Sequence, residues 1–277
     1  QQLIIPLAEF AKNHDTRLVI TFTSKDYTVF QNPAVYQINT PQSYLYSEVY
    51  DHFVRQFPNA NVIFIEASQG TKDKAEFIKG LKDELRNRSI PMKSLKEDVT
   101  VESLKTVLRT DRENIFIPTS GSNLTLIKIL PQLTLLVREQ PESRIHLVGY
   151  PEWQTYTKDH LEAFFELDTY FYSSFYTNNL LPAAINFTKN YRRWYGKEMD
   201  ERYPKFGMLG FDTGYFFLKG LARYGSSFEK NMQGLDLIPI QTGFKFQRVN
   251  NWGGFINKKV FFVHFTKNFE LVKLDFD

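Results

Sequence analysis

Histidine, carboxylate and hydroxyl side chains are the groups in this sequence that could do chemistry. The chain of 277 residues has five histidines and no cysteine, which excludes zinc–thiolate sites, iron–sulfur clusters, disulfides and cysteine nucleophiles. None of the histidines has the H-x3-H or H-E-x-x-H spacing that places two imidazoles on one helix face around zinc. His146 and His264 lie inside predicted strands, where a satisfied core or edge position is the simpler interpretation. The sequence therefore gives no support to a zinc hydrolase.

Hydroxyls and carboxylates form two further patterns. Residues 119–122, Thr-Ser-Gly-Ser, open a predicted helix but are too short to form a phosphate-binding loop. No G-x-S-x-G, Walker or G-x-G-x-x-G pattern joins a strand to a helix anywhere in the chain. Glu162 and Glu166 have the i, i+4 spacing that surface acids commonly have, whereas a glycosidase needs two carboxyls that converge in a cleft. We therefore expect no enzymatic activity, no metal and no cofactor.

The composition indicates a soluble globular protein, with 42% hydrophobic and 23% charged residues. The net charge of +3 is spread evenly, and residues 72–76 alternate Lys with Asp and Glu as on a solvated helix face. No basic block is interleaved with aromatics, so we expect no nucleic-acid partner. No apolar run approaches the roughly 20 residues of a membrane-spanning helix. The aromatic share of 16% fits an aromatic-rich core or an aromatic-lined pocket.

Short apolar runs alternate with longer segments of helical spacing, which is typical of βαβ units around a parallel sheet. Such strands are covered on both faces, so their sequences are continuously apolar. Strands are predicted at residues 18–22, 35–38, 62–65, 115–117 and 144–148. Helices are predicted at residues 4–12, 74–88, 101–108, 124–137, 181–194 and 211–224. The tail is predicted to form strands at residues 243–249 and 259–265 around a turn at 252–254, and a third strand at 270–274.

A spaced aromatic pattern marks the second half of the chain. Phe187, Tyr191 and Tyr195 follow one another at i, i+4 and i+8, so we expect them to pack inward from one helix face. Gly196 directly after them is predicted to be the helix C-cap. Asp212, in a Gly-Phe-Asp-Thr motif at the start of the next helix, is expected to cap that helix or pair locally rather than touch a ligand.

The order of elements, with an F-x3-Y-x3-YG helix, a G-F-D helix and a late G-F-x-F hairpin, resembles the type I periplasmic-binding-protein-like family. This family includes Leu/Ile/Val-binding proteins and receptor ligand-binding regions. The resemblance covers residues 1–277 and implies a two-lobed α/β fold, with parallel sheets flanked by helices and a C-terminal β-hairpin region. Residues 32–39, NPAVYQIN, also resemble Bacteroidetes envelope proteins that join such a region to N-terminal peptidoglycan-binding LysM domains.

In that family the chain crosses between the lobes three times. The crossings would fall near residues 38–41, 171–177 and 239–243. Lobe one would then comprise residues 1–38 and 177–238, and lobe two residues 39–176 and 239–277. A complete first lobe opens with two further βα units, which this sequence lacks before the helix predicted at 4–12. We therefore expect upstream sequence that completes the first lobe.

The resemblance implies a ligand site in the cleft between the lobes, beyond the carboxyl ends of the strands. Helix N-termini with backbone N–H groups and hydroxyls suit a ligand carboxylate there. The matching positions are Thr23, Ser24, Lys25, Gln69, Thr119, Ser120, Tyr150 and Glu152.

Two of these positions depart from the amino-acid-binding pattern. Lys25 stands where a hydroxyl residue is usual, and Gln69 stands where relatives place an aromatic on the ligand. Glu152 falls near the acid that pairs with a ligand amine, although a solvated loop acid is an alternative interpretation. The hydroxyls of residues 119–122 could equally be helix caps.

The resemblance implies a non-catalytic, extracytoplasmic module of the bacterial cell envelope, in the periplasm or associated with the envelope. Its partner would be a small ligand or an envelope protein held between the lobes, with a possible link to peptidoglycan through domains outside this chain. One alternative is the substrate-binding protein of an amino-acid-type ABC transporter, against which Lys25 and Gln69 count. Another alternative is a peptidoglycan-acting enzyme or its activator.

Overall fold

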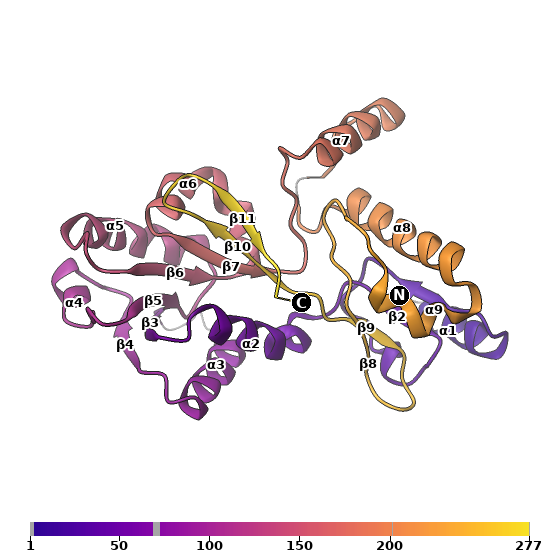
Figure 1. Cartoon of the computed structure of the whole chain (residues 1–277), viewed down its shortest axis with the longest axis horizontal. Helices are drawn as coiled ribbons and strands as arrows, with labels where there is room; N and C mark the ends of the chain where they lie inside the picture. The colour runs from indigo at the N-terminus through magenta and orange to yellow at the C-terminus, as the bar shows by residue number, and fades with distance from the viewer. Residues whose placement is uncertain (1–2, 69–72, 201, 277) are drawn as a thin grey trace. The chain divides into compact units, whose positions relative to one another are not determined.

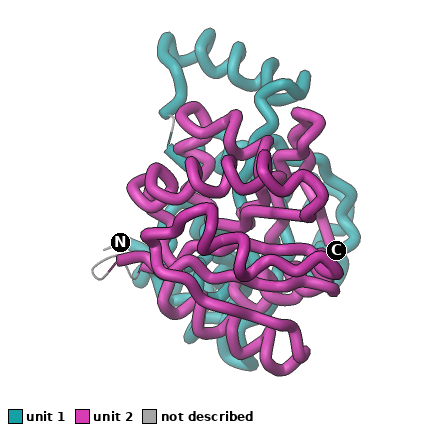
Figure 2. The backbone as a smooth tube through the Cα atoms, turned by 90° about the vertical axis from the view of Figure 1, so that its left-hand side faces the viewer, with its two compact units in different colours: residues 1–45, 174–259 teal, residues 46–173, 260–277 magenta. Residues whose placement is uncertain are grey.

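The computed structural model describes residues 3–68, 73–200 and 202–276, and the chain forms two compact units (Figure 2). Unit 1 comprises Gln1–Leu45 and Ser174–Lys259, and unit 2 comprises Tyr46–Ser173 and Val260–Asp277. The chain thus passes between units three times, and the third passage follows Lys259 rather than residues 239–243, where a crossing was expected. The reason is that the strands at Phe246–Arg248 and Phe255–Asn257 pair within the sheet of unit 1.

Unit 2 contains a seven-stranded sheet in the order β11-β10-β7-β6-β5-β3-β4 (Figure 1). Its strands are β3 (Ala60–Glu66), β4 (Met92–Lys96), β5 (Glu113–Pro118), β6 (Ile145–Gly149), β7 (Thr169–Ser173), β10 (Phe261–Phe265) and β11 (Leu271–Leu274). The five neighbouring strands β7, β6, β5, β3 and β4 are parallel, whereas β10 and β11 are antiparallel to their neighbours. The continuous apolar run at residues 62–65 of β3 is completely buried, because helices cover both faces of the sheet.

Amphipathic helices cover the sheet of unit 2. They are α2 (Tyr46–Gln56), α3 (Ala75–Asn87), α4 (Val101–Lys105), α5 (Asn123–Glu139) and α6 (Thr157–Glu166). In α3, Phe77, Leu81 and Leu85 recur every fourth residue and are buried, as helical periodicity requires. Helices α2 and α3 pack together, and α4, α5 and α6 pack in series. Figure 1 shows the two groups on opposite faces of the sheet.

Strand β4 was not predicted from the sequence, for a physical reason. It lies at the edge of the sheet, and its residues Met-Lys-Ser-Leu-Lys are all partly or fully exposed. An edge strand therefore needs no apolar run. The expected pairing of 243–249 with 259–265 is also wrong. Strand β8 (Phe246–Arg248) pairs with β9 (Phe255–Asn257), while β10 pairs with β7 in unit 2.

Unit 1 contains a four-stranded sheet in the order β1-β2-β9-β8. Its remaining strands are β1 (Leu18–Ile20) and β2 (Val35–Gln37), and its helices are α1 (Ile4–Asn13), α7 (Pro182–Tyr195), α8 (Phe206–Tyr224) and α9 (Phe228–Asn231). Aromatic rings form much of its core. The ring of Tyr36 stacks on Phe255 with 4.8 Å between centroids, and Phe216 stacks on Phe244 at 4.5 Å.

The aromatic pattern on α7 does not pack inward as expected. Phe187 and Tyr191 are half-buried, and Tyr195 is 63% exposed. The ring of Phe187 packs against the neighbouring helix, with 5.1 Å between its centroid and that of Phe211 in α8, and the rings of Tyr191 and Tyr195 contact each other at 4.7 Å. The predicted C-cap at Gly196 is confirmed: this glycine has φ +66°, and its N–H donates to the carbonyl of Arg192.

Asp212 lies inside α8 and does not cap it, yet its carboxylate has a structural role. The fully buried carboxylate accepts hydrogen bonds from the backbone N–H groups of Ile240 at 2.8 Å, Gln241 at 2.8 Å and Thr242 at 2.9 Å. Asp212 therefore does not cap the helix, and its partners are not local, because they lie 28 to 30 residues further along the chain. Asp212 attaches the segment before β8 to the helix.

Replacing this carboxylate should destabilise unit 1. Asp212→Asn puts an amide N–H₂ where a carboxylate oxygen accepted backbone N–H groups, so we expect a loss of about 3 kcal/mol in the free energy of unfolding. Asp236→Asn, at an exposed position of the same unit, is the control. Equal urea midpoints for the two variants would contradict the role assigned to Asp212.

Candidate functional site

Polar side chains gather where β3, β5 and β6 of unit 2 end. Because these strands are parallel neighbours, their carboxyl ends meet at one edge of the sheet. The segments after them contribute five residues, which we call the carboxyl-edge cluster: Asp73, Lys74, Gly121, Tyr150 and Glu152. This edge is where open α/β sheets bind ligands.

The ammonium of Lys74 is the central charge of the cluster. Lys74 is 8% exposed, and its Nζ lies 2.5 Å from Oε1 of Glu152 and 3.8 Å from Oδ2 of Asp73. The same Nζ lies 4.9 Å from the centre of the Tyr150 ring, within range of a cation–π contact. Two carboxylates and a ring face therefore surround one buried cation.

Gly121 allows the cluster to close. A Cβ at this position would lie 2.1 Å from Oε1 of Glu152 and 2.8 Å from Cε of Lys74, so a larger residue would overlap both. Its N–H donates to Oδ2 of Asp73 at 3.2 Å, and its carbonyl accepts from Nε1 of Trp153 at 3.2 Å. The segment after β5 is thus fixed against the segments after β3 and β6.

Tyr150 contributes a ring rather than a free hydroxyl. Its side chain is fully buried, and its hydroxyl donates to the carbonyl of Pro118 at 2.6 Å. Burial raises the pKa of Tyr150 well above its usual value, so the phenol stays neutral.

Further aromatic rings pack around Tyr150. The ring of Phe77 lies 5.6 Å from Tyr150 and 5.3 Å from Tyr172, centroid to centroid. The hydroxyl of Tyr172 is buried and has no hydrogen-bond partner among the described residues. Burial first, then the charges of Tyr46 and Glu152, raise the pKa of Tyr172 well above its usual value. A neutral, unused donor therefore lies near the cluster.

The structure brings Thr119 and Ser120 to the same edge, but their hydroxyls already serve the loop. Oγ1 of Thr119 accepts from the N–H of Ala67 at 2.9 Å, and Oγ of buried Ser120 accepts from the N–H of Ser122 at 3.2 Å. Ser122 is the N-cap of α5 and accepts from the N–H of Thr125. The capping interpretation is thus confirmed for Ser122.

The other predicted site residues do not belong to this cluster. Thr23, Ser24 and Lys25 follow β1 in unit 1, where Oγ1 of Thr23 accepts from the N–H of Lys25 at 3.1 Å. Their contact with a ligand stays a prediction. Gln69 lies outside the described residues.

Sequence reasoning missed Asp73, Lys74, Gly121 and Tyr172. The alternating charges at residues 72–76 were interpreted as a solvated helix face, which is wrong for the buried Lys74. Their position in the chain could have indicated the site, because Asp73 and Lys74 come between a parallel strand and the helix that follows it, as residues 119–122 do.

A buried carboxylate, that of Glu97, lies at the end of β4, the strand next to β3. Glu97 accepts from Nζ of Lys128 at 2.8 Å, from the hydroxyl of Thr125 at 3.1 Å and from the hydroxyl of Ser68. Burial would raise the pKa of Glu97, but these hydrogen bonds outweigh it, so the pKa lies below its usual value of 4.5. Glu97 therefore holds the segments after β3 and β4 to α5.

His146, Asp168 and His264 form a group at the opposite edge of the sheet. Oδ1 of Asp168 lies 2.6 Å from Nε2 of His264, and Oδ2 lies 2.9 Å from Nδ1 of His146. Within residues 3–68, 73–200 and 202–276, no three His, Asp or Glu side chains are arranged to hold a metal ion. His264 is hydrogen-bonded to Asp168, whereas Nδ1 of His146 lies close to Asp168 but has no hydrogen-bond partner among the described residues. The expectation of a satisfied histidine is therefore confirmed for His264 and not for His146.

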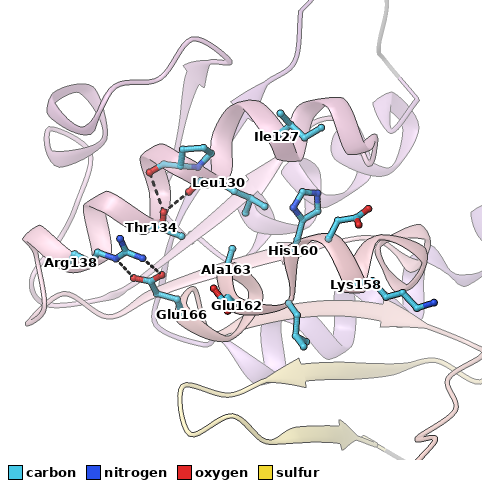
Figure 3. Close-up of a pocket in the computed structure, with 12 residues that line it drawn as sticks. Ile127, Leu130, Thr134, Arg138, Lys158, His160, Glu162, Ala163 and Glu166 are labelled. Atoms are coloured by element: carbon cyan, nitrogen blue, oxygen red, sulfur yellow. Dashed lines mark hydrogen bonds and ion pairs between the residues drawn. The ribbon is translucent and has the colours of Figure 1, made fainter.

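A groove of about 690 Å³ lies between α5 and α6 (Figure 3). Apolar residues of α5 that line it include Ile127 and Leu130. Figure 3 shows Arg138 and Glu166 paired at one end, at 2.6 and 2.8 Å, with His160 toward the other. None of the predicted site residues lines this groove, so it is separate from the carboxyl-edge cluster.

The fold is similar to that of known binding proteins. A putative branched-chain amino acid ABC transporter protein from Rhodospirillum rubrum has a TM-score of 0.57 and 10% identity, over 95% of this chain and 74% of that chain. A periplasmic ligand-binding protein of such a transporter from Burkholderia xenovorans has a TM-score of 0.54 and 11% identity, over 97% of this chain and 73% of that chain. A branched-chain amino acid ABC transporter protein from Thermus thermophilus with bound valine has a TM-score of 0.51 and 12% identity, over 98% of this chain and 75% of that chain. Neither a protein-family model nor a curated protein matches the chain.

This likeness confirms the expected fold class, the two-lobed type I periplasmic-binding fold with parallel sheets flanked by helices. At 10 to 12% identity it shows the fold alone. No helix in the described part of the chain is both long and apolar enough to span a bilayer. The finer resemblance to LysM-linked envelope proteins stays a prediction.

The hydrogen bonds to Glu97 predict a pH-dependent contribution to stability. The folded-state pKa is lowered, so this contribution is complete above the unfolded-state pKa of 4.5 and is lost as the pH falls through the folded-state value. Glu97→Gln should cost about 2 kcal/mol near pH 7, and the difference from the unchanged protein should shrink steadily below about pH 4.5. Urea unfolding between pH 3 and 7 measures both curves. Glu102→Gln, at a side chain that is 82% exposed, is the control and should give parallel curves. A cost at Glu97 that does not change with pH would contradict the assignment.

Proposed function

We propose that this chain is a non-catalytic binding protein that holds a small molecule at the carboxyl edge of the unit 2 sheet. In this proposal the two compact units are the two lobes of the fold, and the protein works outside the cytoplasm, in the cell envelope. The cluster residues position and select the ligand, and no bond is made or broken.

One observation carries the proposal: charge, ring faces and an unused hydroxyl converge where ligands of open α/β sheets bind. Buried Lys74 and partly exposed Glu152 form an ion pair with 2.5 Å between Nζ and Oε1, and Tyr150 supplies a ring face 4.9 Å from the ammonium. Tyr172 supplies a buried hydroxyl without a described partner. An unmade hydrogen bond of this kind is costly in the free protein and is regained when a ligand supplies the acceptor.

The names of two fold neighbours support a binding role, because one is a periplasmic ligand-binding protein and the other has bound valine. They also favour a second candidate within the same class, the substrate-binding protein of an amino-acid-type ABC transporter. The hydroxyl and aromatic positions occupied here by Lys25 and Gln69 count against an amino-acid ligand. So does the pairing of Glu152 with Lys74. A link to peptidoglycan stays a prediction from residues 32–39.

A thermal-shift screen tests the binding role. The panel contains amino acids, carboxylic acids, sugars and muropeptides, and a ligand at 100 times its dissociation constant should stabilise the protein by about 2.7 kcal/mol. If no class raises the melting temperature, the small-ligand proposal fails. Turnover of peptidoglycan by the purified chain would contradict the non-catalytic part.

A matched pair of Tyr variants then tests the site. Tyr172→Phe removes a buried hydroxyl without a described partner, so we expect a gain of about 1 kcal/mol in stability but about tenfold weaker binding of the ligand found in the screen. Tyr150→Phe removes a hydroxyl that donates to Pro118, so it should cost about 1 kcal/mol of stability. Titration calorimetry and urea unfolding of both variants separate the two effects. Full affinity in Tyr172→Phe would place the ligand elsewhere.

A further inference from the structure

The surroundings of the Lys74 ammonium have the composition of a recognition site for a primary amine. An ammonium offers three N–H donors and a full charge, so it is best bound by carboxylate oxygens together with an aromatic face. Glu152 at 2.5 Å, Asp73 at 3.8 Å and the Tyr150 ring at 4.9 Å supply these groups.

We propose that Glu152, Asp73 and the Tyr150 ring form an ammonium-binding box that Lys74 of the chain itself occupies. Lys74 is therefore a specificity-determining residue, because it rejects ligands with a free ammonium group. The site takes small neutral or anionic molecules, such as carboxylic acids that lack an amino group. This statement about ligands rests on the proposed function, whereas the box itself does not.

Space inside the box supports its occupation by one cation at a time. A single added Cβ at Gly121 would lie 2.1 Å from Oε1 of Glu152 and 2.8 Å from Cε of Lys74. The side of the box that faces Gly121 therefore has no room for a second cation beside Lys74.

The box is reachable from solvent at its carboxylates. The side chains of Asp73 and Glu152 are 45% and 29% exposed, whereas that of Lys74 is 10% exposed. A small amine could thus reach the carboxylates if the lysine side chain were removed. Charge favours this entry, because a half-buried carboxylate left without its partner is costly.

Chemical rescue tests the box without knowledge of the natural ligand. Lys74→Ala deletes the atoms from Cγ to Nζ, which correspond to n-propylammonium. At about ten times its dissociation constant, n-propylammonium should raise the melting temperature of this variant by about 3 °C. Propan-1-ol has the same shape but no charge and should have no such effect. The unchanged protein should respond to neither compound.

Two further variants make the rescue specific. Lys74→Ala with Glu152→Gln should lose the response to n-propylammonium, because the charge that binds the amine is gone. Lys82→Ala is the matched control: Lys82 also lies over a ring, that of Phe64, at 4.8 Å, but its carboxylate partner Glu66 is 52% exposed. This variant should not respond. An equal response of Lys82→Ala, or none in Lys74→Ala, overturns the box.

If Lys74→Ala does not fold in buffer, the same compounds still test the box. Refolding yield then replaces the melting temperature: recovery with n-propylammonium but not with propan-1-ol supports the box, and failure with both overturns it.

Valine and 3-methylbutanoate, which differ by the amino group, test the statement about ligands. Stabilisation of the unchanged protein by valine contradicts the exclusion of amines. If n-propylammonium rescues Lys74→Ala but no small molecule stabilises the unchanged protein, the box stands and the proposed function fails.

Discussion

The parallel pairing of β3, β5 and β6 is the constraint on which the rest of unit 2 depends. A buried sheet must pair its backbone N–H and C=O groups, and parallel pairing brings the carboxyl ends of these strands to one edge. Segments that are distant in sequence, at Lys74, Gly121 and Glu152, thereby become neighbours. The sheet determines which side chains can meet, and the chemistry of those side chains determines what the edge can bind.

Neutralising buried charge is the second requirement at this edge. A charge removed from water is tolerated where opposite charges and hydrogen bonds replace the water. Lys74 meets this condition through Glu152 and Asp73, and Glu97 meets it through Lys128 and two hydroxyls. Both arrangements join segments that follow different strands. The ion pairs therefore hold the loops in place as well as shaping the site.

The sequence predicted best where one physical signal acts alone. The apolar runs of β3 and β5 and the periodicity of α3 gave the buried elements, because burial on both faces leaves no other composition. Strand β4 has no apolar run, and Tyr195 has helical spacing but is exposed, so patterning alone could not place either. The resemblance predicted the positions of four residues at the carboxyl ends of the strands, where the structure has them: Thr119, Ser120, Tyr150 and Glu152. Lys74 was missed because a charged residue carries no local sign of burial.

The carboxylates of buried Asp212 and partly exposed Glu152 differ in what can replace their partners. Asp212 is held by three backbone N–H groups, whose positions are fixed by the chain, so no solute can take their place. Glu152 is paired with the end of one lysine side chain, so a free cation can take that place once this side chain is deleted. The carboxylate of Asp212 is therefore committed to the fold. That of Glu152 keeps a binding capacity, which in this chain Lys74 uses.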